Sequence, residues 1–156
     1  MAPSRGTQPE LGDYVGFRRD NRIDRINMKY CLMDQRERTE QIIGCAYRVY
    51  NKMGYGFLES VYEKCLLIEL EKAGLHAESQ VPITVEYDGN SVGDFIADII
   101  VEDTVIIELK SVKQIICAHE VQLVNYLVAT GKEIGLILNF GPTKVDVKRK
   151  ARTLAI

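Results

Sequence analysis

Apolar residues in the first regular part of the chain recur at the three- and four-residue spacing of helices that bury one face. The run after Thr39, a suitable N-cap, predicts a helix that ends at Gly54. A second helix is predicted from about Phe57 to Ala73, with Gly74 as its stop. We therefore expect two consecutive helices joined by a glycine-rich corner.

The pattern changes to alternation after the second helix. Apolar and polar residues alternate over 81–87, and the Asp-Gly-Asn turn at 88–90 leads into a second strand predicted over 92–101. A tight turn centred near 102–103 precedes a third strand over 104–110. The three strands are thus predicted to form an antiparallel meander.

Helical spacing returns over 118–130, where Gly131 is the expected cap. The apolar run IGLILNF at 134–140 predicts a central strand, and Gly-Pro at 141–142 ends it. The segment from Val145 onward predicts a last strand or a tail. The expected order is therefore α-α-β-β-β-α-β, with one further strand at most.

Residues 1–37 show no sustained helical or strand period. They carry scattered Gly and Pro and nearly balanced charges. We therefore expect a flexible or weakly ordered extension over 1–37 and one folded domain over 38–156.

Charge and composition narrow the functional classes. The chain has 20 Lys and Arg against 22 Asp and Glu, a net charge of −2, which argues against a protein that holds nucleic acid by charge alone. The 4 cysteines lack zinc-knuckle spacing and predict reduced thiols in a cytoplasmic protein. No apolar run is long enough to span a bilayer, and the N-terminus does not resemble a secretory signal, so no membrane association is expected.

The most unusual polar residues fall on the second and third predicted strands. Glu108 and Lys110 share one strand face, because side chains alternate along a strand. Asp98 interrupts an apolar run, where a carboxylate is costly unless it is paired or binds a metal. A hairpin centred near 103 makes Asp98 and Glu108 cross-strand neighbours about 5 Å apart. Two carboxylates this close favour a divalent cation, and oxygen ligands favour Mg²⁺ or Mn²⁺ over zinc.

Further polar residues on the predicted helices are candidates for the same site. Glu59 falls in the first turn of the second helix, where its alternative role is to complement the helix dipole. His119, Gln122 and Tyr126 share one face of the third helix. Gln122 and Tyr126 can reach a phosphate or a metal-bound water, or they are an exposed amide and a core-edge aromatic. His119 alone is typical of a cap or surface residue.

The order of these motifs resembles the PD-(D/E)XK nuclease superfamily, in particular its RecB-like branch, in which a helical Gln-x-x-x-Tyr follows the Glu-x-Lys strand. The segment Gly56 to Tyr62 is similar to the motif of the small GxxExxY proteins, as are the phrases GFLESVYE, ADIIV, IIELKSV, HEVQLVNYL and LILNFG. The resemblance covers residues 39–149. The Pro-Asp of the superfamily is Ala97-Asp98 here, a departure that removes no ligand.

The resemblance implies a three-layer α/β/α restriction-endonuclease-like core with a mixed β-sheet. It also implies a metal site, in which Asp98, Glu108 and Glu59 bind Mg²⁺ or Mn²⁺. Lys110 is then expected to orient or activate the attacking water and to stabilise charge on the phosphate.

Gln122 and Tyr126 are expected, by the same resemblance, to position the scissile phosphate or the surrounding water. The implied function is that of a metal-dependent nuclease that cleaves phosphodiester bonds in DNA, with RNA as the second choice. Both endonuclease and exonuclease action are compatible with this residue set.

Two other functions stay open at this stage: a non-catalytic nucleic-acid-binding or accessory subunit with the same fold, and a hydrolase of a small phosphate compound. A homodimer or a larger complex would enlarge the binding surface of so small a domain. A basic run near the C-terminus offers either a phosphate track or a solvated face. It consists of Lys144, Lys148, Arg149, Lys150 and Arg152.

Overall fold

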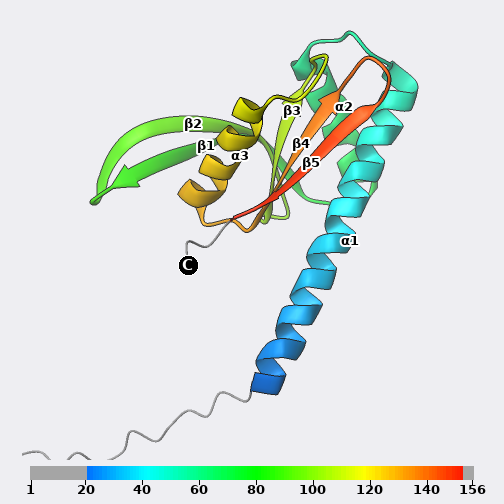
Figure 1. Ribbon diagram of the computed structural model, residues 1–156. Coiled ribbons are helices and arrows are strands. Elements are labelled where there is room, and N and C mark those ends of the chain that lie inside the picture. The colour runs from blue at the N-terminus through cyan, green and yellow to red at the C-terminus, as the bar shows by residue number, and fades with distance from the viewer. Residues whose placement is uncertain (1–20, 153–156) are drawn as a thin grey trace, which may run out of the picture. The chain divides into compact units, whose positions relative to one another are not determined.

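The computed structural model describes the backbone of residues 21–152 and the side chains of residues 34–152. The chain divides into two units, Met1–Asp34 and Gln35–Ile156, and the sheet lies within the second. The described elements are, in chain order, α1 (Asn21–Met53), α2 (Glu59–Lys72), β1 (Ala77–Tyr87), β2 (Asn90–Val101), β3 (Val105–Lys110), α3 (Cys117–Thr130), β4 (Ile134–Phe140) and β5 (Val145–Ala151) (Figure 1).

The first helix begins earlier than predicted from the sequence. α1 begins at Asn21, whereas the prediction placed its start at Thr39 and assigned residues 1–37 to a flexible extension. The prediction was wrong for the helical part of that segment, because Ile23, Ile26, Tyr30 and Met33 recur at helical spacing and residues 17–43 contain neither glycine nor proline. Residues 1–20 of the predicted extension lie outside the described residues.

Thr39, the expected N-cap, lies inside α1. Its hydroxyl donates to the Arg36 carbonyl at 2.8 Å, and its side chain is buried. One turn of the helix is also bridged by an ion pair between Arg36 and Glu40 at 3.1 Å. Local interactions of this kind add to the stability of the helix.

Five strands form one mixed sheet in the order β1-β2-β3-β4-β5. β1, β2 and β3 form the expected antiparallel meander. β3 and β4 are parallel, because α3 carries the chain back across the sheet between them. β5 pairs antiparallel with β4, so the segment expected to be a strand or a tail is an edge strand.

Helices cover both faces of the sheet, which confirms the three-layer α/β/α fold (Figure 1). On one face, α1 and α2 pack onto the sheet through buried residues such as Ile42 and Leu66. On the other face, Leu123 of α3 packs against Ile106 and Ile137. β3 lies between β2 and β4 and is covered on both sides, so polar groups on it are removed from water.

The β1–β2 hairpin is longer than the rest of the sheet. β2 pairs with β3 only over Ile99–Val101, although its pairing with β1 continues to the turn after Tyr87. Residues 81–97 therefore form an arm that extends past the sheet (Figure 1). The turn between β2 and β3 is tight, with left-handed φ angles of 52° at Glu102 and 54° at Asp103.

We expect Gly135 of β4 to tolerate no side chain, because α3 lies directly over it. A Cβ atom there would lie 2.6 Å from Leu123 Cδ1 and 2.9 Å from its Cγ. Gly135→Ala should lower the free energy of unfolding by about 1–3 kcal/mol through overpacking. Urea denaturation followed by circular dichroism measures this change.

Gly44→Ala is the matched control. A Cβ at Gly44 meets only Arg48 Nη1 at 3.6 Å, and alanine is favoured over glycine inside a helix by about 0.5–1 kcal/mol. This variant should be as stable as the parent or more stable. Equal losses in the two variants would contradict the close packing of α3 on β4.

Candidate functional site

Glu108 is a buried acid on the central strand β3. Its side chain is 4% exposed, and its Oε1 has no hydrogen-bond partner. Burial and, after it, the charge of Asp98 raise the pKa of Glu108 to about 8, although Lys110 opposes the shift. A smaller contribution from Glu59 also raises it. Because ionising this buried carboxyl group is unfavourable, binding of a proton or a cation would stabilise it.

Asp98 lies beside Glu108, just past the last pair of the β2–β3 ladder. The ladder between β2 and β3 ends at the pair Ile99–Ile107, and Asp98 is the next residue of β2. Its Oδ2 accepts a hydrogen bond from the Leu109 amide at 2.7 Å, so the carboxylate ties the two strands where their pairing stops. Burial raises the pKa of Asp98 as well, against the Leu109 amide, Lys110 and Glu108.

A break in the strand alternation turns Asp98 towards β3. Ala97 packs in the core under α3, whereas Ile99, two residues later, packs in the core under α1 and α2. Residues two apart on a regular strand share a face, so the alternation shifts at Asp98. On β1, Gln80 lies between two paired positions and has a left-handed φ of 53°. The register of β1 with β2 is the same on both sides of Gln80, so this is a local backbone irregularity without an inserted residue, and the register shift of the hairpin lies between Val85 and Glu86.

Lys110 supplies the positive charge of the cluster. It is half-buried at the end of β3 and shares the strand face of Glu108. Its charge lowers the pKa of both Asp98 and Glu108. The structure thus brings together the acid of β2 with the acid and the lysine of β3, the three residues on which the sequence argument placed most weight.

Glu59 and Glu63 present two further carboxylates from α2. Glu59 is the first residue of the helix and is exposed, and its charge is felt at Glu108. Glu63, one helical turn later, was missed by the sequence reasoning. Burial raises its pKa, Asp98 adds to that shift, and Gln80 Nε2 donates to its Oε2 at 2.7 Å. The four-residue spacing from Glu59 was the feature that could have identified it.

The tyrosine of the GFLESVY segment has a structural role. Tyr62 is fully buried, and its ring stacks on Phe140 at a centroid separation of 4.2 Å. Its hydroxyl donates to the Gly54 carbonyl at 2.5 Å and accepts from the Phe57 amide at 3.3 Å. Ser111, which follows Lys110, donates to the Phe57 carbonyl at 2.9 Å. These bonds fix the loop that leads into Glu59.

Gln122 and Tyr126 of α3 form a hydrogen-bonded pair at the site. Gln122 Nε2 donates to the Tyr126 hydroxyl at 2.8 Å, which leaves the tyrosine proton available to a ligand. Burial raises the pKa of Tyr126, and the charges of Glu108 and Asp98 also raise it, so the hydroxyl lies within reach of their field. The expected shared face of these two side chains is confirmed.

Two side chains that do not enter the site hold the connection from β3 to α3. His119 Nδ1 accepts from the Ile116 amide at 3.2 Å, so this histidine caps α3. Asn139, buried in β4, accepts from the Val112 amide at 2.9 Å and donates to the Val112 carbonyl at 2.9 Å. Asn139 was not predicted from the sequence, although an amide inside an otherwise apolar strand indicates a specific hydrogen-bonding role.

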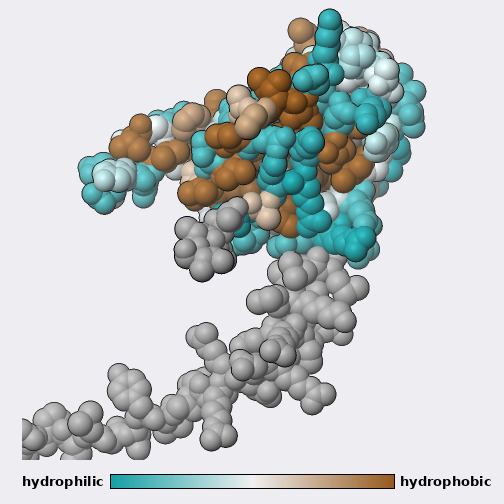
Figure 2. All heavy atoms as spheres, viewed as in Figure 1, coloured by the Kyte–Doolittle hydropathy of each residue, from teal (hydrophilic) through white to brown (hydrophobic). Residues whose placement is uncertain are grey.

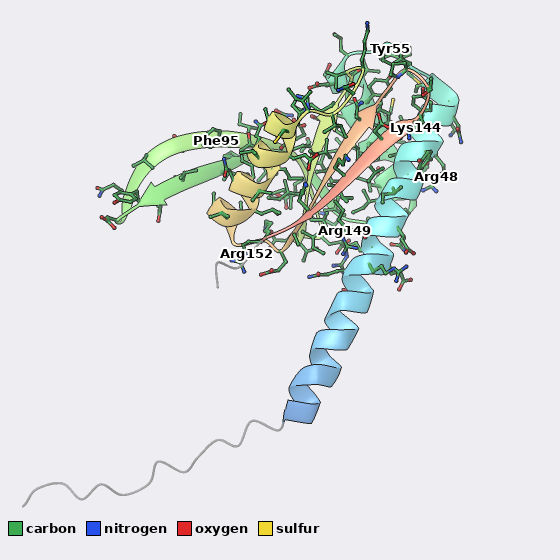
Figure 3. The ribbon with its side chains drawn as sticks, viewed as in Figure 1. Arg48, Tyr55, Phe95, Lys144, Arg149 and Arg152 are labelled. Carbon is green, nitrogen blue, oxygen red and sulfur yellow. The ribbon has the colours of Figure 1, made fainter. Side chains whose placement is uncertain are left out.

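The basic run along β5 is partly neutralised by acids. Arg149 lies in β5, Lys144 directly precedes the strand and Arg152 directly follows it (Figure 3). The ion pairs are Lys144 with Asp146, Lys150 with Glu120 and Arg152 with Glu133. The remaining exposed charges, on Lys148 and Arg149, form a weaker phosphate track than the sequence count indicates.

The residues fit a divalent cation held by few protein ligands. Within residues 34–152, no three His, Cys, Asp or Glu side chains are gathered into a metal cage, so a three-ligand set of Asp98, Glu108 and Glu59 stays a prediction. Mg²⁺ usually binds through one or two carboxylates together with waters and substrate phosphates. The unpartnered Glu108 Oε1 beside Asp98 meets that requirement.

A mixed sheet between helical layers carries an acid on β2 and the Glu-x-Lys motif on β3, in the order that the sequence predicts. The chain belongs to the PD-(D/E)XK nuclease superfamily, whose family model matches residues 36–150. The likeness to the GxxExxY proteins stays a resemblance.

Comparison with solved structures shows the same fold. The crystal structure of SSO0001 superposes with a TM-score of 0.51 at 20% sequence identity, over 62% of this chain and 52% of that one. The chain thus spans about half the length of that protein, and the likeness shows the fold alone. No curated protein matches the chain. Among the described residues, no helix combines the length and apolar character needed to cross a membrane.

Tyr62→Phe tests the structural role of the motif tyrosine. The variant keeps the ring that stacks on Phe140 but removes the hydroxyl that satisfies the Gly54 carbonyl and the Phe57 amide. We expect the free energy of unfolding to fall by about 1–3 kcal/mol, the cost of buried groups left unpaired. Tyr47→Phe, which removes a longer bond of 3.3 Å from a more exposed side chain, is the control and should cost less. An unchanged Tyr62→Phe protein would refute this role.

Glu108→Gln should make the metal-free protein more resistant to alkaline pH. The folded-state pKa of Glu108 is about 8, well above the usual value of about 4.3. Between these values the folded state holds a proton that the unfolded state lacks, so stability falls as pH rises through this window. Glu108→Gln removes that loss, on the order of a few kcal/mol at full ionisation. Denaturation with chelator from pH 5 to pH 9 measures the difference.

Glu120→Gln is the control, because the pKa of Glu120 is shifted in the opposite direction to that of Glu108. The pKa of Glu120 is lowered by the Lys150 ammonium, so its charge stabilises the folded state above its unfolded pKa. This variant should gain nothing over the parent across the same window. Parallel pH curves for the parent and Glu108→Gln would contradict a raised pKa at Glu108.

Proposed function

We propose that the protein is a metal-dependent nuclease that hydrolyses phosphodiester bonds of DNA, with RNA as the second candidate substrate. The observation that carries the proposal is the buried Glu108 with its unpartnered oxygen, beside Asp98 and on the same strand face as Lys110. Burying two acids next to each other lowers the stability of the fold, which indicates that they are kept for a function. Membership of a superfamily of nucleases supports the same conclusion.

Each residue of the proposed site then has a chemical role. Asp98 and Glu108 hold Mg²⁺ or Mn²⁺, and Glu59 completes the site directly or through water. Bound there, a divalent cation supplies positive charge that lowers the pKa of water and neutralises the phosphate. Lys110 orients the attacking water and offsets the negative charge that grows on the phosphate during reaction.

Tyr126 and Gln122 act on the substrate side. The Gln122 amide fixes the Tyr126 hydroxyl as an acceptor, so the phenol proton points to a substrate oxygen. Glu63 is a fourth acid near Asp98, and the repulsion between the two carboxylates adds to the negative charge that a cation would neutralise. Its hydrogen bond from Gln80 links α2 to β1 beside the site.

A non-catalytic nucleic-acid-binding or accessory subunit is the second candidate. The ion pairs that neutralise part of β5 favour it, because they leave the domain with a weak hold on a phosphate backbone. A homodimer or a larger complex would supply the missing surface in either case.

We also propose a cytoplasmic location. Cys45 is buried, Cys65 is half-buried and Cys117 is exposed, and these three described cysteines are free thiols. Free thiols are typical of a reducing compartment. Alkylation of the protein in freshly opened cells, followed by mass spectrometry, would detect any disulfide.

A cleavage assay tests the proposed function. Plasmid, linear duplex, single-stranded DNA and single-stranded RNA are each incubated with Mg²⁺, Mn²⁺ or chelator. We expect metal-dependent cleavage by the parent and a loss of at least about 100-fold in rate for Lys110→Ala and for Asp98→Ala. The loss follows from removing, respectively, a fixed positive charge and a metal ligand.

Lys72→Ala is the matched control, because Lys72 pairs with Glu69 at the opposite end of α2 from Glu59. It should cleave at the parental rate. Cleavage that survives chelation, or that persists in both site variants, would refute the proposal. Absent cleavage with calorimetric binding of Mg²⁺ by the parent, but not by Asp98→Ala, would favour the accessory role.

A further inference from the structure

An apolar groove lies between the arm and α3, directly beside the Gln122–Tyr126 pair. A hollow of about 410 Å³ is lined by Val85 and Phe95 from the arm and by Val121 and Asn125 from α3, together with that pair. A second hollow of about 500 Å³ shares Val85, Phe95 and Asn125 with the first, so the two adjoin, and we call them together the groove. Figure 2 shows apolar side chains gathered over the arm and α3.

Phe95 is the most conspicuous side chain of this groove. It projects from the arm (Figure 3), and it is 45% exposed although it is a large apolar residue. Its ring lies 5.5 Å from that of Tyr126, tilted by 48°, so the exposed side chain lies next to the Gln122–Tyr126 pair. Val121 and Val128 of α3 are also exposed. Exposed apolar surface next to a site is typical of a binding surface.

The groove is neutral where it meets the site. The residues that line the nearer hollow include no charged side chain, and the polar groups there are the amides of Gln122 and Asn125 and the hydroxyl of Tyr126. An aromatic face with amide groups at its edge suits a flat, neutral ring with donors and acceptors on its rim. It does not suit a phosphate or a charged peptide. A nucleobase has this chemistry, and bases stack readily on aromatic side chains.

We propose that this groove holds an unpaired base of a single-stranded nucleic acid, and that Phe95 thereby makes single strands the preferred substrate over intact duplex. The inference rests on the proposed function, because the phosphate next to that base lies at the Asp98–Glu108 site. The phosphate is placed there because Tyr126 both lines the groove and lies near Glu108 and Asp98. Bases of an intact duplex are stacked and paired, and reach such a groove only after extrusion from the helix.

The test measures binding in a Lys110→Ala background, so that the strand is not cut. Fluorescence anisotropy follows three labelled ligands of equal length: a single strand, its duplex, and a strand of abasic residues that keeps the phosphates. DNA and RNA strands are both used. Phe95→Ala should weaken binding of the normal strand about 5- to 100-fold and leave the abasic strand unchanged. The normal strand should also bind more tightly than the duplex.

Tyr87→Ala is the matched control, because Tyr87 is an exposed aromatic on β1, in the same hairpin, that does not line the groove. It should bind all three ligands as the background protein does. Asn125→Ala, on an exposed helical position where alanine is well tolerated, should also weaken only the strand that carries bases. This second variant decides the question if Phe95→Ala fails to fold.

Three results would overturn the inference. One is equal loss on the normal and abasic strands, and another is no loss for either Phe95→Ala or Asn125→Ala. The third is a change of molar mass in light scattering for Phe95→Ala with unchanged strand binding, which would make the groove a contact between two copies. Failure of the proposed function looks different: the parent cleaves no substrate, while base-dependent binding through Phe95 persists.

Discussion

The free-energy cost of removing the Glu108 carboxyl from water is the constraint on which the arrangement of charged groups around β3 depends. β3 has a strand on each side and helices above and below, so a carboxylate at its end is deprived of solvent without being given a hydrogen bond to both oxygens. The neighbours make the cost larger, because Asp98 adds a like charge that Lys110 and a hydrogen bond from the Asp98 backbone offset in part. A fold that keeps such a cluster gives up stability, and a ligand that neutralises the charge restores it.

The same irregularity of β2 creates both the site and the groove next to it. At Asp98 the strand leaves β3, which frees that side chain to cross to the Leu109 amide. Beyond this point β2 stays paired only with β1, and the arm that results carries Phe95 over α3. The acid cluster and the apolar groove therefore have a common origin, because both depend on the end of the β2–β3 pairing at Ile99.

Much of this structure could be predicted from the sequence, for identifiable reasons. The strand Ile134–Phe140 was predicted with its observed bounds, because its apolar run is closed by Gly-Pro. The proximity of Asp98 to Glu108 followed from a tight turn and from alternation. The start of α1 was missed, although Ile23, Ile26 and Tyr30 recur at helical spacing, because charged residues and the glycines before residue 17 obscured the pattern. Glu63 was overlooked as an ordinary helical acid, and its approach to Asp98 depends on how α2 packs on the sheet.

The turn at Glu102 and Asp103 limits how the length of this chain can change. It sets the register that places Asp98 beside Glu108, and Lys132 ties it down through two hydrogen bonds of 2.8 Å to Asp103. Because side chains alternate, one inserted residue there would move Glu108 to the face under α1 and α2. The turn at the tip of the arm sets no such register for the acids. Insertions and deletions are therefore tolerable at the tip and disruptive at 102–103, so these two neighbouring turns should differ in evolutionary freedom.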